Sequence, residues 1–298
     1  MQPSQSPPPF PFDLEDSAAY EAWCEWKLKD YPTRLGDLVV EIGDPAALTG
    51  AEHDALLQRV RKTNMALYAS ARGNDPDKGL IRALGRRFGL ERLDHNMCAD
   101  DDAITSLRVQ PDALHQGYIP YSNRPIAWHT DGYYNDLEHQ ILGLLLHCVQ
   151  PAARGGANEL LDHEILYMQL RDLDPEYIRA LMHPRAMTIP ANVVDGEELR
   201  PARTGPVFMR LPGGQLHMRY TDRSRSIEWR DDPLTREAVA ELKRLLRTRS
   251  PYHFEGTLQS GQGLVSNNVL HTRSGFEDDE SRPRILYRAR YFDRIGGT

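Results

Sequence analysis

The chain has 298 residues, of which 40% are hydrophobic and 27% charged, and its net charge is −7. This composition is that of an ordinary globular protein, and the length suits one large domain or two small ones. The acidic balance gives no basic surface for nucleic acid, and no apolar run reaches the length of a membrane span. The three cysteines stand far apart without a C-x-x-C pair. We therefore expect neither a disulfide framework nor a structural zinc site, and a reducing, cytoplasmic setting.

The first hundred residues are predicted to be largely helical, after a proline-rich arm at residues 1–11. The arm lacks the basic and apolar segments of a signal peptide, and its prolines favour an extended, mobile chain. Gly89 follows the third predicted helix as a suitable C-cap. We assign residues 12–102 to the helical beginning of a single domain that spans 12–298. The segments with helically spaced apolar positions are 14–31, 49–63 and 78–89.

From residue 103 the pattern changes to that of β-strands, so residues 103–298 are expected to carry the β core. The apolar run 140–151 ends at a proline and has the length of a strand buried on both faces. Two helices interrupt the strands and begin at Asp174–Pro175 and Asp232–Pro233, where an N-cap precedes a proline in the first helical position. This order does not keep the rhythm of a parallel α/β sheet. It predicts a sandwich or barrel of mostly antiparallel strands wrapped by helices.

The stretch IAWHTDGYY contains a candidate metal-binding pair. Side chains alternate along a β-strand, so His129 and Asp131 emerge on the same face. His271 ends a later apolar strand, GLVSNNVLH, and stands before a turn rich in glycine and acidic residues. Arg284 follows thirteen residues after His271, and alternation places Arg288 on the same face of the last strand. Together these residues form an ordered set of candidate site residues.

Two histidines and one carboxylate on one face of Fe(II) leave three coordination positions open, as in the facial triad of non-haem iron oxygenases. A 2-oxo acid fills two of them through its carboxylate and oxo group, and dioxygen the third. Arg284 suits the far carboxylate, because a guanidinium binds a carboxylate through two parallel hydrogen bonds. His147, inside the long apolar run, is interpreted as a hydrogen-bonded core residue. Arg290 is interpreted as lying on a solvated face.

These motifs resemble those of the Fe(II)/2-oxoglutarate oxygenases of the taurine dioxygenase superfamily. WHTD and the ending LH…RPRILYRA are similar to its metal and keto-acid motifs, and QPAARGGANELLD resembles its Gly-Gly turn. Residues 118–170 and the spacing from His271 to Arg284 look closer to the γ-butyrobetaine hydroxylase branch. The resemblance covers residues 103–292 and implies an α+β fold with a double-stranded β-helix (jelly-roll) core and flanking helices. It implies that the site consists of the Fe(II) ligands His129, Asp131 and His271 and the 2-oxoglutarate-binding residues Arg284 and Asn158.

The resemblance implies oxidation of a C–H bond coupled to decarboxylation of 2-oxoglutarate, with O2 as cosubstrate and succinate and CO2 as products. Asp131 favours hydroxylation, because the family's halogenases have a small residue there, while desaturation and cyclisation stay open. Arg288 and Arg219 are expected to bind an anionic group of the substrate. Tyr133 is expected to form a wall of the substrate pocket, and Tyr121 matches an aromatic position of the betaine-binding relatives.

Three hypotheses follow. The first is a hydroxylase of a small, anionic metabolite. The second is the same chemistry on a quaternary ammonium (betaine-like) compound, bound by aromatic residues through cation–π contacts. The third is a non-catalytic jelly roll that binds metal, which is disfavoured because a structural metal site closes its coordination shell. A small-molecule substrate is expected, without nucleic-acid or membrane partners, and the sequence leaves open whether the chain forms a homo-oligomer.

Overall fold

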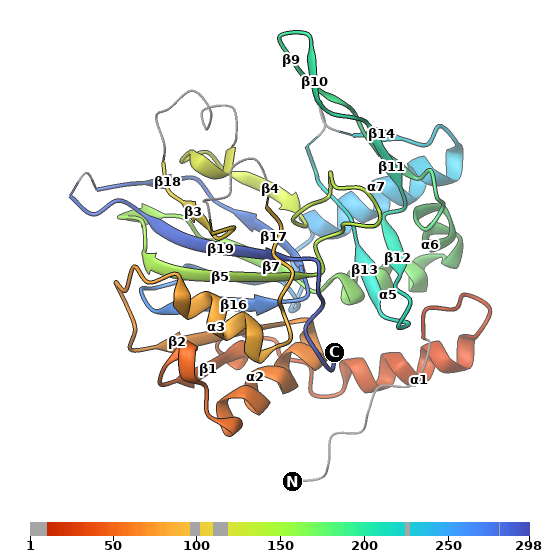
Figure 1. The fold of residues 1–298 in the computed structure, drawn as a ribbon. Helices are drawn as coiled ribbons and strands as arrows, with labels where there is room; N and C mark the ends of the chain where they lie inside the picture. The colour runs from red at the N-terminus through yellow and green to blue at the C-terminus, as the bar shows by residue number, and fades with distance from the viewer. Residues whose placement is uncertain (1–10, 96–101, 110–118, 224–226, 280) are drawn as a thin grey trace. The chain divides into compact units, whose positions relative to one another are not determined.

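A computed structural model describes residues 11–95, 102–109, 119–223, 227–279 and 281–298 (Figure 1). The predicted proline-rich arm therefore lies almost wholly outside the described residues. The chain divides into two compact units. The helical unit comprises the chain up to Pro32 and His163–Ser250, and the sheet unit comprises Thr33–Asp162 and Pro251–Thr298. These units do not coincide with the predicted division at residue 103, because the sheet unit takes strands from both sides of that position.

The sheet unit is built on a six-stranded sheet with the order β1-β2-β16-β5-β19-β3. The β1–β2 pair is parallel, and the other neighbours are antiparallel. β5 is the strand that the long apolar run predicted, and all of its residues but Gln150 are buried. β1 and β2 come from the part of the chain predicted to be largely helical. The strands are β1 Val39–Ile42, β2 Met65–Ser70, β3 Thr105–Leu107, β5 Gly143–Gln150, β16 Gln262–Ser266 and β19 Ile285–Tyr291.

A four-stranded antiparallel sheet, ordered β15-β7-β17-β4, completes the β core of this unit. A short pair, β6 Arg154–Gly155 and β18 Phe276–Glu277, extends beyond it. Arg288 in β19 contacts Asp131, which follows β4, so the two sheets face each other at this point. The strands of the smaller sheet are β4 Ile126–His129, β7 Asn158–Leu161, β15 Phe254–Gly256 and β17 Leu270–Arg273.

Two helices, α2 (Gly50–Thr63) and α3 (Gly79–Arg87), cover the outer face of the six-stranded sheet (Figure 1). Thr49 begins α2 with a capping box, in which its hydroxyl and the Glu52 carboxylate each accept a bond from the other residue's backbone N–H. Gly89 follows α3 at φ +73°, the left-handed conformation expected for a glycine after a helix. Apolar side chains of both helices pack against β5, β16 and β19 in one cluster.

The helical unit contains α1 (Ser17–Leu28). With α2 and α3 of the sheet unit, the three helices predicted before residue 102 are all present. Asp174 and Asp232 cap α6 and α7 with proline in the first turn, as the sequence predicted. α5 is His163–Leu173, α6 Pro175–Leu181 and α7 Pro233–Arg247. The remaining strands of this unit are β8 Met187–Ile189, β9 Asn192–Val194, β10 Glu197–Arg200, β11 Arg203–Gly205, β12 Phe208–Arg210, β13 Leu216–Met218 and β14 Glu228–Trp229.

The chain is thus a mixed α/β protein whose larger unit is dominated by sheet, in agreement with the predicted class. Cys24 and Cys148 are free thiols, while Cys98 lies outside the described residues. Among the helices that the structure describes, none is long and apolar enough to cross a membrane.

His147 of β5 is the hydrogen-bonded core histidine that the sequence predicted. Its Nδ1 lies 2.9 Å from the Tyr68 hydroxyl, and the two rings stack. The imidazole is fully buried. Burial lowers its pKa to about 4, with Asp75 opposing the shift. The neutral form is therefore the one that the folded protein holds.

Because its folded-state pKa lies below the unfolded value, His147 takes up a proton more readily in the unfolded chain. Between pH 7 and pH 5 this difference should lower the free energy of unfolding by about 2 kcal/mol. A His147→Gln variant keeps an acceptor for Tyr68 but does not titrate. We expect denaturant titrations at the two pH values to show a smaller loss for the variant, and equal losses would contradict the assignment.

Candidate metal centre

The three predicted metal ligands come together on the four-stranded sheet. His271 in β17 is the direct ladder partner of His129 at the end of β4, and Asp131 follows two residues later. One possible ligand atom from each side chain lies within 4.8 Å of the others. The Nδ1 atom of each histidine lies 2.9 Å from a backbone carbonyl, that of Ala127 or Val269. A carbonyl can only accept, so Nδ1 carries the proton and each Nε2 is left to bind a cation.

Burial and charge hold the three groups in the forms that bind metal. Burial, and then the neighbouring His271, lower the pKa of His129 to about 3, and burial also lowers that of His271. For Asp131, burial by itself would raise the carboxyl pKa, but Arg288 and Arg290 reverse this and hold it well below its usual range. Neutral imidazoles and an ionised carboxylate are therefore the stable states.

One carboxylate oxygen of Asp131 has a hydrogen-bond partner and the other has none among the described residues. Oδ1 lies 3.3 Å from Nη1 of Arg288, whereas Oδ2 is buried and has no hydrogen-bond partner in the described part of the chain. A buried, unpaired carboxylate oxygen is costly unless a cation or donor meets it. Together with the two Nε2 atoms it forms a two-histidine, one-carboxylate donor set, which fits a divalent iron ion.

Asn268 fixes the backbone that carries Asp131. Its Oδ1 accepts from the Asp131 N–H at 2.8 Å, and its Nδ2 donates to the carbonyls of Asp131 and Ile141 at 2.9 and 2.7 Å. Gly132 adopts φ +68°, and a Cβ there would lie 2.3 Å from the Ile141 side chain. Sequence reasoning missed Asn268; its only signal was an asparagine just before the His271 strand, a residue type that tolerates its left-handed φ of +53°.

Arg284 is buried, as expected of a residue that binds a carboxylate away from water. Its guanidinium lies over the Phe276 ring at 4.9 Å, and Nη1 has no hydrogen-bond partner among the described residues. Gly156, at φ +73° in the Gly-Gly turn, leaves space beside it, since a Cβ there would lie 3.5 Å from Arg284 Nε. Asn158, two residues on, begins β7, and its Nδ2 donates to the Thr272 carbonyl at 2.7 Å.

Arg273 is a buried cation that the sequence analysis did not identify. Its guanidinium donates to backbone carbonyls of the segment 119–124 and lies 5.0 Å from the Phe276 ring. Burial, and then repulsion from Arg284 and Arg288, lower its pKa to about 9. Burial likewise lowers the pKa of Arg284. A bound anion would relieve this accumulation of positive charge.

The interpretation of Arg290 as a solvated residue is wrong. Its side chain is only 3% exposed because it lies on the inner face of β19, where it forms an ion pair with Asp94. It also donates to the Tyr134 hydroxyl at 2.8 Å. Burial by itself would lower its pKa, but Tyr134, Asp131 and Asp94 raise it overall. The alternation of β19 was predicted correctly, whereas the face that it presents to solvent was not.

The residues predicted to contact substrate lie in different parts of the two units. Tyr121 is buried in a cluster with Leu286 and Cys148 inside the sheet unit, and Tyr133 packs edge-on against Tyr134. Arg219 belongs to the helical unit. There its guanidinium donates to the carbonyls of Met187 and Arg203 at 3.2 and 2.7 Å. Substrate-binding roles for these residues stay predictions.

Comparison with known sequences gives a consistent result. Residues 40–290 match the family model described as "Taurine catabolism dioxygenase TauD, TfdA family". A uridine-5'-phosphate dioxygenase from a Streptomyces species is 31% identical over 199 residues, which cover 64% of this chain and 69% of that protein. Another, from an Amycolatopsis species, is 29% identical over 278 residues, which cover 86% of this chain and 97% of that protein. These relatives do not support the resemblance to the γ-butyrobetaine hydroxylase branch.

Solved structures with the same fold are also oxygenases. Asparagine oxygenase in complex with Fe(II), 3-hydroxyasparagine and succinate has a TM-score of 0.58 at 14% identity and covers 93% of this chain and 85% of its own. The non-haem iron oxygenase OrfP, in complex with Fe and alpha-ketoglutaric acid, has a TM-score of 0.58 at 17% identity, with coverages of 84% and 82%. At this level of identity the likeness concerns the fold alone.

The structure predicts how metal binding depends on Asn268. Asn268→Gly keeps a residue that accepts φ +53° but removes the three hydrogen bonds, so Fe(II) affinity should fall by roughly 10- to 100-fold. His271→Ala should abolish binding, and exposed His139→Ala should leave it unchanged. Anaerobic calorimetric titration with Fe(II), alongside circular dichroism as a test of folding, measures all three. Full affinity in Asn268→Gly would exclude a positioning role.

Proposed function

Because this chain belongs to the taurine catabolism dioxygenase TauD, TfdA family, and is a 2-oxoglutarate-dependent non-haem iron dioxygenase, we propose that it hydroxylates a small, anionic metabolite that carries a phosphate group. The first candidate substrate is a nucleoside 5'-monophosphate such as uridine 5'-phosphate. The observation that carries the proposal is the buried His129–Asp131–His271 set, in which two Nε2 atoms and the unpaired Asp131 Oδ2 converge. Its neighbours Arg284 and Arg288 supply positive charge.

His129, Asp131 and His271 are the residues that would hold Fe(II), which supplies activation of dioxygen coupled to decarboxylation of 2-oxoglutarate. Arg288 engages Asp131 Oδ1 and thereby leaves Oδ2 for the metal. The low pKa values of the histidines keep protons from competing for Nε2 near neutral pH. Retention of a carboxylate at position 131 supports hydroxylation.

Arg284 and Asn158 are the proposed 2-oxoglutarate-binding residues. Arg284 is 4% exposed as a residue, so a carboxylate that pairs with it is shielded from water, and the pair is stronger than it would be at the surface. The unpaired Nη1 offers a donor, and the open side of Gly156 leaves space beside the guanidinium. Asn158 begins the strand that follows this turn. These features support a site for the far carboxylate of the keto acid.

Formal charges favour an anionic substrate. Fe(II) with ionised Asp131 has one net positive charge, Arg284 and Arg288 add two, and dianionic 2-oxoglutarate removes two. One positive charge remains, without counting the buried Arg273. A low-dielectric site with residual positive charge attracts an anion and repels a trimethylammonium group. The names of the two curated relatives agree with the anionic hypothesis, and the betaine alternative is not favoured.

We also infer that the two facing sheets of the sheet unit form the double-stranded β-helix that the resemblance implies. The pairing of β17 with both β4 and β7, and of β19 with β5, supports this topology.

Replacing Arg284 with alanine should weaken 2-oxoglutarate binding while leaving Fe(II) binding nearly intact. Loss of one partner of a buried charge pair costs about 2–5 kcal/mol, which is roughly 30- to 5,000-fold in binding constant. The matched control is Arg282→Ala, because Arg282 is exposed two residues earlier. Calorimetric titration of the metal-loaded protein with 2-oxoglutarate measures the difference. An unchanged affinity in Arg284→Ala would move the assignment to another arginine.

The substrate class is tested by succinate release with nucleoside 5'-monophosphates, the matching nucleosides and betaines, each with mass detection of a product heavier by one oxygen atom. We expect coupled turnover with a 5'-monophosphate and at least about ten-fold lower kcat/KM with the nucleoside, which lacks the charge. Arg288→Lys should retain more of this preference than Arg288→Leu. Coupled turnover with betaines alone would refute the anionic substrate while leaving the iron and 2-oxoglutarate assignments intact.

A further inference from the structure

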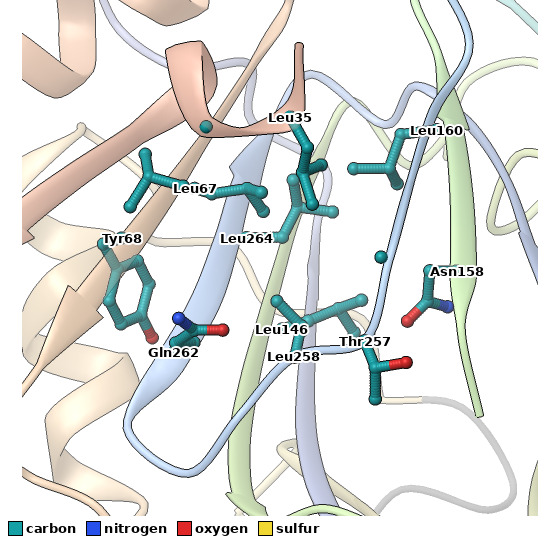
Figure 2. A pocket seen from close by; sticks show the side chains of 13 residues that line it. Leu35, Leu67, Tyr68, Leu146, Asn158, Leu160, Thr257, Leu258, Gln262 and Leu264 are labelled. Atoms are coloured by element: carbon teal, nitrogen blue, oxygen red, sulfur yellow. The ribbon is translucent and has the colours of Figure 1, made fainter. Parts of the chain in front are cut away.

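A cavity of about 130 Å³ lies between the two sheets of the sheet unit, apart from the proposed metal ligands (Figure 2). Its walls come from β1, β2, β5 and β16 on one side and from β7 and the segment 256–258 on the other. Four leucines and a valine make up most of its inner surface, and Leu35 and Leu258 are only partly buried. The inner residues are Val39, Leu67, Leu146, Leu160 and Leu264.

Polar side chains line part of the cavity, and two of them are bonded to the protein. Figure 2 shows Gln262, Thr257 and Asn158 along one edge, and Tyr68 and leucine side chains over the rest. Gln262 Oε1 accepts from the Gln259 N–H at 2.9 Å, and Asn158 Nδ2 donates to Thr272. No charged side chain is among the described residues that line it. A dianion such as 2-oxoglutarate therefore finds no counter-ion there.

Strand register makes the apolar walls continuous with the metal centre. Across the four-stranded sheet, Leu160 is paired directly with His271, which is in turn paired with His129. Residues paired in this way have side chains on the same face, about 5 Å apart. The leucine wall thus ends beside a metal ligand.

The six-stranded sheet repeats this arrangement on the opposite wall. Leu264 of β16 is paired with Leu146 of β5, and Leu146 is paired with Arg288 of β19. Arg288 is the residue that contacts Asp131. Both walls therefore lead from the cavity to the metal centre within one or two strands.

Size and polarity decide what this cavity can hold. Sites for metabolites usually have volumes of roughly 300–1,000 Å³, well above this one. Apolar cavities of about 150 Å³ stay dry and take up xenon and other small apolar molecules. Gly36, Leu35 and Gln262 at the rim are wholly or partly exposed, so the cavity has access to solvent.

We propose that this cavity is a dioxygen-holding site that supplies the metal centre by a route lined with leucines. Dioxygen is small and apolar, and partitions from water onto apolar cavity walls as xenon does. The inference depends on the use of dioxygen as cosubstrate but not on the identity of the substrate proposed above. It assigns Leu67, Leu146 and Leu264 a function in gas binding beyond core packing.

Xenon binding tests the cavity without turnover. In crystals of the wild-type protein under xenon pressure, we expect xenon density among Leu67, Leu146, Leu160 and Leu264. Leu67→Phe should remove it, because Leu67 lines the cavity and the larger ring fills the space. Val265→Leu is the matched control, since Val265 lies in the same sheet but on its opposite, helix-covered face. Absence of xenon from the wild-type cavity would overturn the proposal.

Kinetics test whether the gas held there is used. With succinate release measured without primary substrate, Leu67→Phe should raise the KM for dioxygen by roughly three-fold or more, with the KM for 2-oxoglutarate and kcat at saturating dioxygen unchanged. Val265→Leu should leave all three values unchanged. If Leu67→Phe does not fold, Leu258→Trp at the partly exposed rim takes its place. Loss of xenon with an unaltered KM for dioxygen would refute delivery, whatever the true substrate is.

Discussion

The antiparallel pairing of β17 with β4 is the constraint on which the metal centre depends. It places His271 opposite His129, and the same register places Leu160 on the other side of His271. A shift by one residue would turn every side chain of β17 to the other face and remove the ligand. Asn268 stabilises this arrangement. It lies two residues before the start of β17, and its side chain is hydrogen-bonded to the backbone N–H and carbonyl of Asp131. The ligand set is thus held by backbone geometry before any metal binds.

Charge compensation is the second requirement of this interior. The inner face of β19 carries Arg288 and Arg290, which bury cations in a sheet of mostly apolar side chains. Arg290 is neutralised by Asp94, whereas Arg288 shares Asp131 with the metal centre. Arg284 keeps an unpaired buried donor. An unpaired buried donor costs free energy, and a bound anion removes that cost. The site therefore favours anionic ligands.

The interior between the sheets is divided by the same strands into a polar and an apolar part. Arg288, Arg290 and the two metal-binding histidines lie on β19, β17 and β4, while the inner leucines of the cavity lie on β2, β16, β5 and β7. The division follows from strand order, since β2, β16 and β5 precede β19 in one sheet, and β7 lies beside β17 in the other. A polar region suits the charged cosubstrate, and an apolar one suits a gas. The cavity proposed for dioxygen and the arginines proposed to hold 2-oxoglutarate thereby differ in polarity, and Asn158 lies at the boundary between them.

The sequence by itself determined the local chemistry of this protein. The alternation of β19 and the helix caps at Asp174 and Asp232 follow from periods and capping preferences that act within a few residues. Those features were predicted correctly. Asp131 lies in the turn after β4, where Asn268 fixes its backbone. Which face of a strand is buried depends on partners far along the chain. For this reason Arg290 was assigned to solvent, although it is buried and forms an ion pair with Asp94. The places of Asn268, Arg273 and the leucine cavity depend on which strands pair, a long-range choice that no local pattern reveals.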